Sequence, residues 1–367
     1  MLTVEFSKKR QARLLEVMQQ RRLDAIVVGS SPHVYYLSAF LPSWLHQAGF
    51  VLFADGRSQL ISPNTPAAGA AADQVIPYDA NWFSTLRQEQ PMAVADKLTE
   101  ALTARSASSI GLDASTVSSQ VAMAFDGSCV SIDPEIWQLR RRKDPDELAL
   151  MKTAIRCAEA MYARAREIII PGVPELQVFS ELHAVAVQTA GEPMFIPLGN
   201  DYACGVAGGP ARANRAAGDG EIYILDLGPT FHGYFSDSAR SFAVNRKLTD
   251  VQMKAWESIT AALKMVEGAA KPGVRCAELF RMVDEHFRHT RGGGGLTHHL
   301  GHGVGLQPHE YPHLNPKWDD VLIEGEIFTA EPGQYGPDLA GGIRLENQYL
   351  VTRDGVENLL NVPLDLI

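Results

Sequence analysis

The sequence predicts an α/β chain of two domains, and three observations support this prediction. The chain has 367 residues, which exceeds the usual size of a single domain. Short apolar segments alternate with helical patterns from the N-terminus onward, as in α/β layer folds. A stretch in the C-terminal half occurs twice in related form, which indicates an internal duplication there.

The N-terminal third alternates helices and strands. Apolar residues at helical spacing predict a helix over residues 6–22. Short apolar segments predict strands, and a turn at Asp55-Gly56 joins the second to the third: 24–28, 49–54, 59–61 and 109–112. Another helix is predicted over residues 91–104. Pro91 falls in its first turn, where a missing N–H costs little because no intrahelical acceptor awaits it.

The two domains are predicted to meet near residue 140, giving domains 1–139 and 140–367. A basic run, LRRRKDPD, lies at this point, and we expect its charges to be solvated. Pro145 in this run fits the start of a long helix predicted over residues 146–170.

The duplicated stretches carry acidic residues at matching positions. One copy reads GEIYILDLG and the other GEIFTAEPG, which aligns Asp226 with Glu331. A second acid follows each copy, Asp237 after the first and Glu346 after the second. The pattern therefore predicts, in each half, a strand that carries one acid and a second strand that carries another.

Two divalent metal ions would explain four carboxylates in such apolar surroundings. A buried unpaired carboxylate costs several kcal/mol, and four converging carboxylates also repel one another. The alternative is that each acid caps a strand end or forms a salt bridge. For any single acid that alternative is as good, but the repeated pattern of all four favours metal ions.

Histidines in the sequence HHLGHGVGLQPHE add a nitrogen donor. His302 has a glycine on each side, which permits close approach of the backbone to a ligand or metal, and we assign it to the metal site. His298 and His309 are candidates for substrate contact or proton transfer, whereas His299 is expected to be structural or on the surface. Four oxygen donors and one nitrogen favour manganese or cobalt, with zinc and iron also compatible. A pair of such ions can activate water and polarise a carbonyl group, which is the chemistry of a hydrolase.

Composition excludes several other functions. The net charge of −10 argues against nucleic acid or an anionic membrane as a partner. No run of 18 apolar residues and no signal-peptide pattern occurs, so we expect a cytoplasmic protein without membrane spans. The glycines at 292–295 lack the lysine of a phosphate-binding loop. The four cysteines form no CxxC pattern and are expected to be buried: Cys129, Cys157, Cys204 and Cys276.

The segments DLGPTFHGYFSD, HHLGHGVGL, TAEPG and GIRLE together resemble the M24 metallopeptidases of the pita-bread fold. That family includes prolidase, Xaa-Pro aminopeptidase, methionine aminopeptidase and the non-metal creatinase. Residues 33–40, HVYYLSAF, are similar to the creatinase-type N-terminal domain. The resemblance implies a creatinase-like α/β domain followed by a pita-bread domain with a pseudo-two-fold internal repeat. It also implies a homodimer.

The resemblance implies a role for each metal-site residue. Asp226 would bind one metal, Asp237 and Glu346 would bridge the two, and His302 and Glu331 would bind the other. Glu331 would also carry the proton between the attacking water and the leaving amine.

Four further residues take roles from the resemblance or from position. His298 and His309 match the histidines that hold the substrate and steady the tetrahedral intermediate. Arg344 would balance the charge of Glu346 or, alternatively, bind substrate. Tyr335, four residues after Glu331, either lines the site or packs nearby.

One position departs from the family pattern. Prolidase-like members carry a histidine upstream in an HxxP pattern, and here Ala207 stands at that place. No histidine occurs between His183 and His232. Because this family histidine is absent, the sequence does not decide which substrate the protein takes. Trp44 and His46, in an apolar N-terminal loop, could lie at a subunit interface or have a simple surface or core role.

The sequence therefore predicts a metal-dependent hydrolase of short Xaa-Pro peptides, either a dipeptidase or an aminopeptidase. A non-peptide C–N hydrolase or a lyase for a small compatible solute, such as ectoine or dimethylsulfoniopropionate, is the alternative that Ala207 favours. A non-catalytic binding protein on the same scaffold is a third possibility, and the complete set of five metal ligands argues against it.

Overall fold

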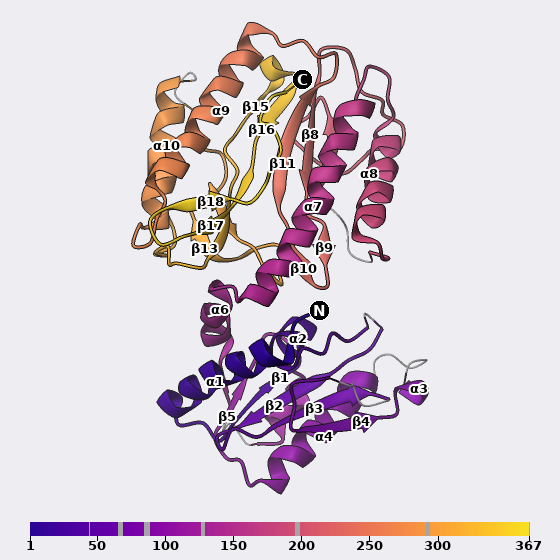
Figure 1. Cartoon of the computed structure of the whole chain (residues 1–367), viewed down its shortest axis with the longest axis vertical. Helices are drawn as coiled ribbons and strands as arrows, with labels where there is room; N and C mark the ends of the chain where they lie inside the picture. Colours follow the sequence, from indigo (N-terminus) through magenta and orange to yellow (C-terminus); the bar gives the residue numbers. More distant parts are fainter. Residues whose placement is uncertain are drawn as a thin grey trace. The chain divides into compact units, whose positions relative to one another are not determined.

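The computed structural model describes residues 1–43, 45–64, 69–83, 89–125, 129–194, 199–290 and 294–366. These residues form two compact units, Met1–Arg140 and Arg141–Ile367 (Figure 1). Trp44 and two of the four glycines at 292–295 lie outside the described residues.

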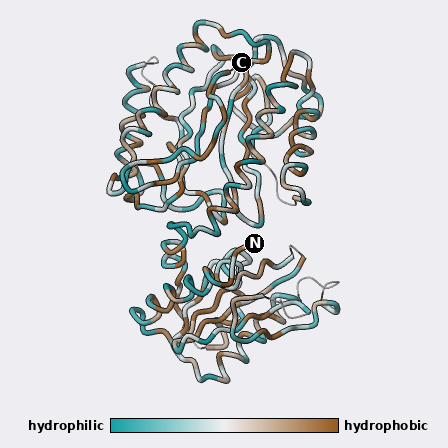
Figure 2. The backbone as a smooth tube through the Cα atoms, viewed as in Figure 1, coloured by the Kyte–Doolittle hydropathy of each residue, from teal (hydrophilic) through white to brown (hydrophobic). Residues whose placement is uncertain are grey.

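The N-terminal unit is built on one mixed sheet. Its elements are α1 (Val4–Arg21), β1 (Ala25–Val28), α2 (Ser31–Ser38), β2 (Gly49–Phe53), β3 (Ser58–Pro63), β4 (Gln74–Tyr78), α3 (Ala80–Phe83), α4 (Glu89–Ala104), β5 (Ile110–Leu112), α5 (Ser119–Met123), β6 (Cys129–Ser131) and α6 (Asp133–Arg141). The strand order is β4-β3-β2-β1-β5-β6, in which β2 runs antiparallel to both its neighbours. The central strands are the hydrophobic part of this unit in Figure 2, as expected for a sheet covered by helices.

Local sequence signals account for these elements. Thr3 caps α1, because its side chain accepts a hydrogen bond from the Phe6 N–H. Gly56 takes a φ of +86° in the turn between β2 and β3, as the Asp-Gly pair predicted. Helix α4 begins at Glu89, so Pro91 lies in its first turn. Of the four cysteines only Cys129 is half-buried, and the other three are buried as expected.

The C-terminal unit places strands between two pairs of helices. Its elements are α7 (Pro145–Ile168), α8 (Glu175–Ala190), β7 (Asp201–Cys204), β8 (Ile222–Leu227), β9 (Thr230–Phe231), β10 (Tyr234–Phe235), β11 (Ser238–Ala243), α9 (Asp250–Ala269), α10 (Cys276–Thr290), β12 (Gly301–Gly303), β13 (Glu310–Leu314), β14 (Ile327–Ala330), β15 (Gly333–Gly336), a 3₁₀ turn (Pro337–Leu339), β16 (Gly341–Arg344), β17 (Asn347–Val351) and β18 (Val356–Asn358). Helices α7 and α8 lie on one side of the strands and α9 and α10 on the other (Figure 1).

Proline and charged residues define the start of this unit. Pro145 is the first residue of α7, as predicted, and the Glu147 carboxylate accepts a hydrogen bond from the Asp144 N–H at 2.8 Å. The expectation that the basic run is solvated is wrong for three of its residues, because the side chains of Arg140, Arg141 and Lys143 are buried. The Arg141 guanidinium pairs with Glu326 and donates to the Val321 carbonyl oxygen. A buried arginine requires such partners, and none of them could be identified from the neighbouring sequence.

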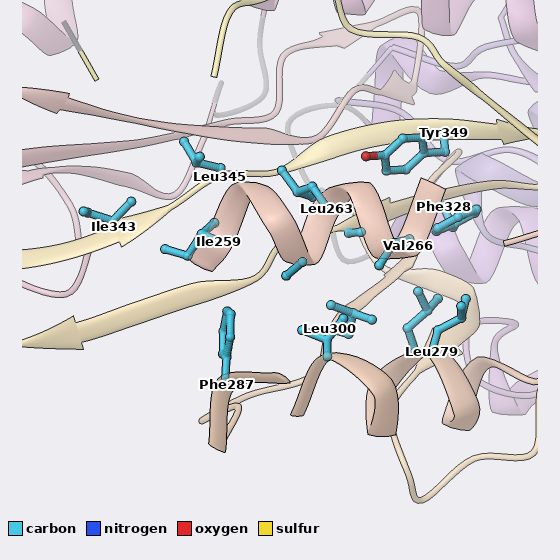
Figure 3. Close-up of a cluster of buried hydrophobic side chains, with 14 of the residues drawn as sticks. Ile259, Leu263, Val266, Leu279, Phe287, Leu300, Phe328, Ile343, Leu345 and Tyr349 are labelled. Atoms are coloured by element: carbon cyan, nitrogen blue, oxygen red, sulfur yellow. The ribbon is translucent and has the colours of Figure 1, made fainter. Parts of the chain in front are cut away.

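Apolar side chains hold the helices on the strands. Figure 3 shows Ile259, Leu263 and Val266 of α9 in one cluster with Leu279 and Phe287 of α10 and with side chains of the neighbouring strands. All five are at most 1% exposed. A second cluster fixes α7 and α8 against β7, β8 and β11. The strands that carry the candidate site are therefore held from both sides.

The two duplicated stretches form equivalent antiparallel pairs of strands. In the first, β8 pairs with β11, and Leu227 lies opposite Ser238. In the second, β14 pairs with β17, and Ala330 lies opposite Asn347. Each rung has an acid next to it on both strands, but the register differs: Asp226 precedes Leu227, whereas Glu331 follows Ala330. The Glu346 N–H donates to the Ala239 carbonyl oxygen at 2.9 Å, and this hydrogen bond joins the halves.

Candidate metal centre

The five predicted metal ligands converge in the C-terminal unit. Their donor atoms form two overlapping groups, each with all its donor atoms within 4.8 Å of one another. One group consists of Asp226, Asp237 and Glu346, and the other of His302, Glu331 and Glu346. All five residues are buried, with 1 to 9% exposure. Because Glu346 belongs to both groups, its carboxylate is placed to serve two ions.

Strand ends position these side chains. Asp226 lies in β8, and Asp237 directly precedes β11, its strand partner. Glu331 directly follows β14, and Glu346 directly precedes β17. His302 is the central residue of β12, which pairs with β14. The duplication thus delivers one acid from each of four strand ends, and the histidine comes from a fifth strand.

His302 presents a free nitrogen to the acids. Its Nδ1 lies 3.0 Å from the Gly303 carbonyl oxygen, which can only accept, so Nδ1 carries the hydrogen. The lone pair of the neutral ring is then on Nε2, 3.4 Å from Glu331 Oε1 and 3.7 Å from Asp237 Oδ2. This tautomer is the one a metal ligand requires.

The glycines beside His302 serve the strands rather than a ligand. A Cβ added to Gly301 would collide with the Thr329 carbonyl oxygen, and one added to Gly303 with the Tyr311 carbonyl oxygen. The predicted close approach is therefore present, but the atoms that approach belong to neighbouring backbone. The expectation that these glycines admit a ligand to the backbone is replaced by this steric role.

Burial and mutual repulsion disfavour the ionised form of several of these acids, and bound cations would offset both effects. Burial raises the pKa of Asp226 to about 6, despite the opposing charge of Arg344. Burial and the neighbouring carboxylates raise the pKa values of Asp237 and Glu346 well above their ordinary range. Among the described residues, one oxygen of Asp226 and both oxygens of Glu346 are buried without a hydrogen-bond partner. The donor set therefore fits divalent cations, which would pair these oxygens.

His299 lies inside this site, contrary to the expectation that it is structural or on the surface. Its Nε2 is 2.8 Å from Glu331 Oε1. Burial alone would raise the pKa of Glu331, but the hydrogen bond from His299 and the nearby ring of His302 outweigh it and lower that pKa. The same hydrogen bond raises the pKa of His299. The family pattern matches its neighbour His298, and so it did not identify His299.

The two remaining predicted histidines also reach the site. His298 Nδ1 donates to the His299 carbonyl oxygen at 2.8 Å, and its Nε2 lies 2.9 Å from the Tyr335 hydroxyl. His309 stacks on His302 with ring centroids 3.7 Å apart. Burial and the nearby rings of His302 and His299 lower the pKa of His309 to about 4. His309 is therefore neutral at pH 7 and able to accept or donate a hydrogen bond.

Arg344 connects the acids to a residue that the sequence did not suggest. Its Nη2 pairs with Asp201 and lies 2.8 Å from Asp226 Oδ2, and its Nη1 lies 3.2 Å from the Tyr335 hydroxyl. The charge of Arg344 thus balances Asp226 and Asp201 directly, and it acts on Glu346 only at longer range. Asp201 is separated from Arg344 by 143 residues and belongs to no motif, so no sequence signal identified it.

The loop that carries Ala207 contacts the site through its glycines, next to Asp201. Ala207 itself is exposed. The Gly209 N–H donates to Asp201 Oδ1 at 2.6 Å, and a Cβ on Gly208 would meet the Asp201 carboxylate. The loop therefore encloses Asp201, and no imidazole enters the site from it.

The ligands line a cavity of about 240 Å³, which also contains Asn200 and Asp201. A second hollow of about 380 Å³ shares His298 and His299 with it and extends to Phe280 and Trp318. Volumes of this order accommodate a small molecule or a short peptide segment.

Comparison with known proteins identifies the family. Residues 10–142 match the creatinase/prolidase N-terminal domain, and residues 149–353 match metallopeptidase family M24. The chain belongs to metallopeptidase family M24. Its fold is accordingly the creatinase-type α/β domain followed by the pita-bread domain, as predicted. Membership also implies divalent metal ions, in agreement with the donor set.

Several relatives of this M24 enzyme have been described. It is 27% identical over 361 residues to the Xaa-Pro dipeptidase of Pyrococcus horikoshii, covering 97% of each chain. It is 32% identical over 242 residues to a putative dipeptidase of Bacillus subtilis, covering 65% of each. Its fold matches the crystal structure of a prolidase from Pyrococcus horikoshii with a TM-score of 0.81, at 24% identity and covering 98% of this chain and 100% of the other. An X-Pro aminopeptidase from Thermotoga maritima gives 0.82, at 23% identity and covering 97% and 99%.

Within the part of the chain that the structure describes, no helix of the M24 enzyme is both long and apolar enough to cross a bilayer.

Proposed function

We propose that this M24 enzyme is a dinuclear metal-dependent hydrolase that cleaves short Xaa-Pro peptides as a dipeptidase or an aminopeptidase. The observation that carries the proposal is the pair of overlapping donor groups that share Glu346. Support also comes from two relatives named Xaa-Pro dipeptidase, both of which span nearly the whole chain. Manganese or cobalt is the expected metal, since four of the five donors are carboxylates.

The residues would divide the chemistry among themselves. Divalent ions supply Lewis-acid activation of water and of a carbonyl group when bound at such a site. Asp226, Asp237 and Glu346 would hold one ion, and His302, Glu331 and Glu346 the other. Glu331, with a low pKa, is ionised and able to accept a proton from the attacking water and pass it to the leaving amine.

Two histidines and an arginine would position the substrate. His298 and His309 line the cavity beside the donors and can hydrogen-bond to the substrate and to the developing oxyanion. Because His309 has a pKa of about 4, it would act at neutral pH as a neutral ring. The main role of Arg344 would be to hold the Asp226 carboxylate in place, and not to bind the substrate.

The second candidate function is hydrolysis or elimination of a small non-peptide solute, such as an ectoine-type ring or dimethylsulfoniopropionate. The observation that favours it is the loop at Ala207, which is exposed and contributes no imidazole to the cavity. A substrate without a peptide amide has less need of that group. A non-catalytic binding role is disfavoured, because a protein without chemistry gains nothing from buried carboxylates that need cations.

A substrate panel distinguishes these functions. Metal-free protein is reconstituted with manganese, cobalt or zinc and assayed on Xaa-Pro dipeptides, Xaa-Pro-Yaa tripeptides, ectoine and dimethylsulfoniopropionate. Release of proline from dipeptides supports a dipeptidase, and cleavage of tripeptides alone supports an aminopeptidase. Turnover of a solute but of neither peptide class would contradict the leading proposal.

The proposal also covers the oligomeric state of the protein and its location in the cell. We expect a homodimer in the cytoplasm. Size-exclusion chromatography with light scattering tests the dimer: a mass near twice 40.1 kDa supports it, and a mass near 40.1 kDa contradicts it. Fractionation of cells tests the location.

A further inference from the structure

His299 approaches the same oxygen of the metal-binding carboxylate Glu331 as His302 does. The backbone N–H of Glu331 donates to the Leu300 carbonyl oxygen at 2.8 Å, which sets Glu331 beside the segment 299–302. His299 Nε2 then lies 2.8 Å from Glu331 Oε1, and His302 Nε2 lies 3.4 Å from the same oxygen. The closer of the two imidazoles is thus the one that was not expected in the site.

The hydrogen bond has a fixed direction. A carboxylate only accepts, so His299 Nε2 must carry the hydrogen. This holds for the neutral ring with its hydrogen on Nε2 and for the imidazolium alike. The function of His299 as a donor therefore does not depend on its state of charge.

The Glu331 side chain has few restraints of its own. It shares the site with three other carboxylates, which repel it, and a glutamate side chain has three rotatable bonds. Among the described residues, the side-chain partners of Glu331 are His299 and His302. If His302 is engaged with a metal ion, His299 is the one described side chain that still donates a hydrogen bond to the Glu331 carboxylate.

We propose that His299 is a positioning residue. Its Nε2–H fixes the Glu331 carboxylate and thereby raises the affinity for the metal ion held by His302 and Glu331. The inference rests on the proposed function, because it presumes that the site binds metal ions. Hydrogen bonds of this kind to a metal ligand are typically worth 10- to 100-fold in metal affinity. The second metal group, centred on Asp226 and Asp237, does not touch His299 and should be little affected.

Two other roles compete with this one. His298, His299 and Glu331 form a group whose donor atoms lie within 4.8 Å, so His299 could itself ligate an ion. Its side chain is also 35% exposed and lines both hollows, so it could contact only the substrate. Positioning, ligation and substrate contact predict different metal-binding isotherms.

The test is calorimetric titration of manganese into metal-free full-length protein at pH 8. The variants are His299→Ala, which removes the donor, and His299→Gln, whose amide N–H can still donate. His289→Ala is the matched control, because His289 is an exposed histidine of α10 bonded only to the Glu285 carbonyl oxygen among the described residues. Circular dichroism of the metal-free variants checks that each is folded.

Positioning predicts two ions per chain in every variant. One dissociation constant should rise 10- to 100-fold in His299→Ala, change less than about 3-fold in His299→Gln and stay constant in the control. Loss of one ion from the stoichiometry would identify His299 as a ligand and overturn the inference. Unchanged affinities with a raised KM would assign it to the substrate and overturn it equally. Wild-type protein that binds no manganese would contradict the proposed function itself.

Discussion

Replacing Glu346 with glutamine should stabilise the metal-free protein and abolish its response to metal. The Glu346 side chain is 1% exposed, and both its oxygens lack hydrogen-bond partners among the described residues. Without cations its charge is opposed by Asp237, Glu331 and Asp226. Glutamine keeps the shape of the side chain and removes the charge, and its amide can donate to a neighbouring carboxylate.

The magnitude follows from the neighbouring acid. The pKa of Asp226 rises from 3.8 to about 6, which corresponds to about 3 kcal/mol, since one pKa unit is worth about 1.4 kcal/mol. Asp226 has Arg344 as a partner, whereas Glu346 has no direct counter-charge. Part of the gain is lost to burying the amide, so we expect the free energy of unfolding of Glu346→Gln to increase by about 1–3 kcal/mol.

The assay is urea unfolding followed by circular dichroism at pH 8, with a chelator and then with manganese. Manganese at 100 times its dissociation constant should add about 2.7 kcal/mol per ion to the wild type and far less to the variant. Glu357→Gln, at an exposed position on β18, is the matched control and should behave as wild type. A metal-free Glu346→Gln protein less stable than the wild type would refute the reasoning.

Three further predictions concern the same site. The folded-state pKa values of Asp237 and Glu346 are raised, so the folded metal-free protein binds more protons than the unfolded chain, and its free energy of unfolding should fall between pH 6.5 and 8.5. His309, whose pKa is lowered to about 4, has the opposite effect, but only below pH 6.5. Chemical unfolding at both pH values measures this, and a rise would contradict it. Tyr335→Phe removes the hydroxyl bonded to His298 and should lower kcat about 10-fold with two metal ions retained; a lost ion in elemental analysis would contradict it. Asp201→Asn weakens the pair with Arg344 and should cost about 1–2 kcal/mol of stability, with no change in urea midpoint as the contrary result.

The repeated arrangement of acids was predictable because it is local. A strand, an acid at its end and a second acid before the paired strand recur in both copies, and strand pairing alone brings each pair together. The start of α7 at Pro145 was predictable for the same reason, since a helix N-terminus is specified by neighbouring residues. The α/β fold class followed from the alternation of apolar segments with helical patterns, and the family from four short motifs.

The rest depends on contacts between distant segments. Asp201 meets Arg344 across 143 residues, and nothing in either local sequence indicates the pair. His299 was misjudged because its direction depends on how β12 pairs with β14, which the pattern of residues does not reveal. Arg141 was expected in solvent because its partner Glu326 lies far along the chain.

The central claim is that two metal ions occupy the site at Glu346. Anomalous diffraction from crystals soaked in manganese measures this directly. The account predicts two peaks about 3.5–4 Å apart, one beside Asp226 and Asp237 and the other beside His302 and Glu331, with the Glu346 carboxylate between them. A single peak, or peaks away from these five residues, would contradict it.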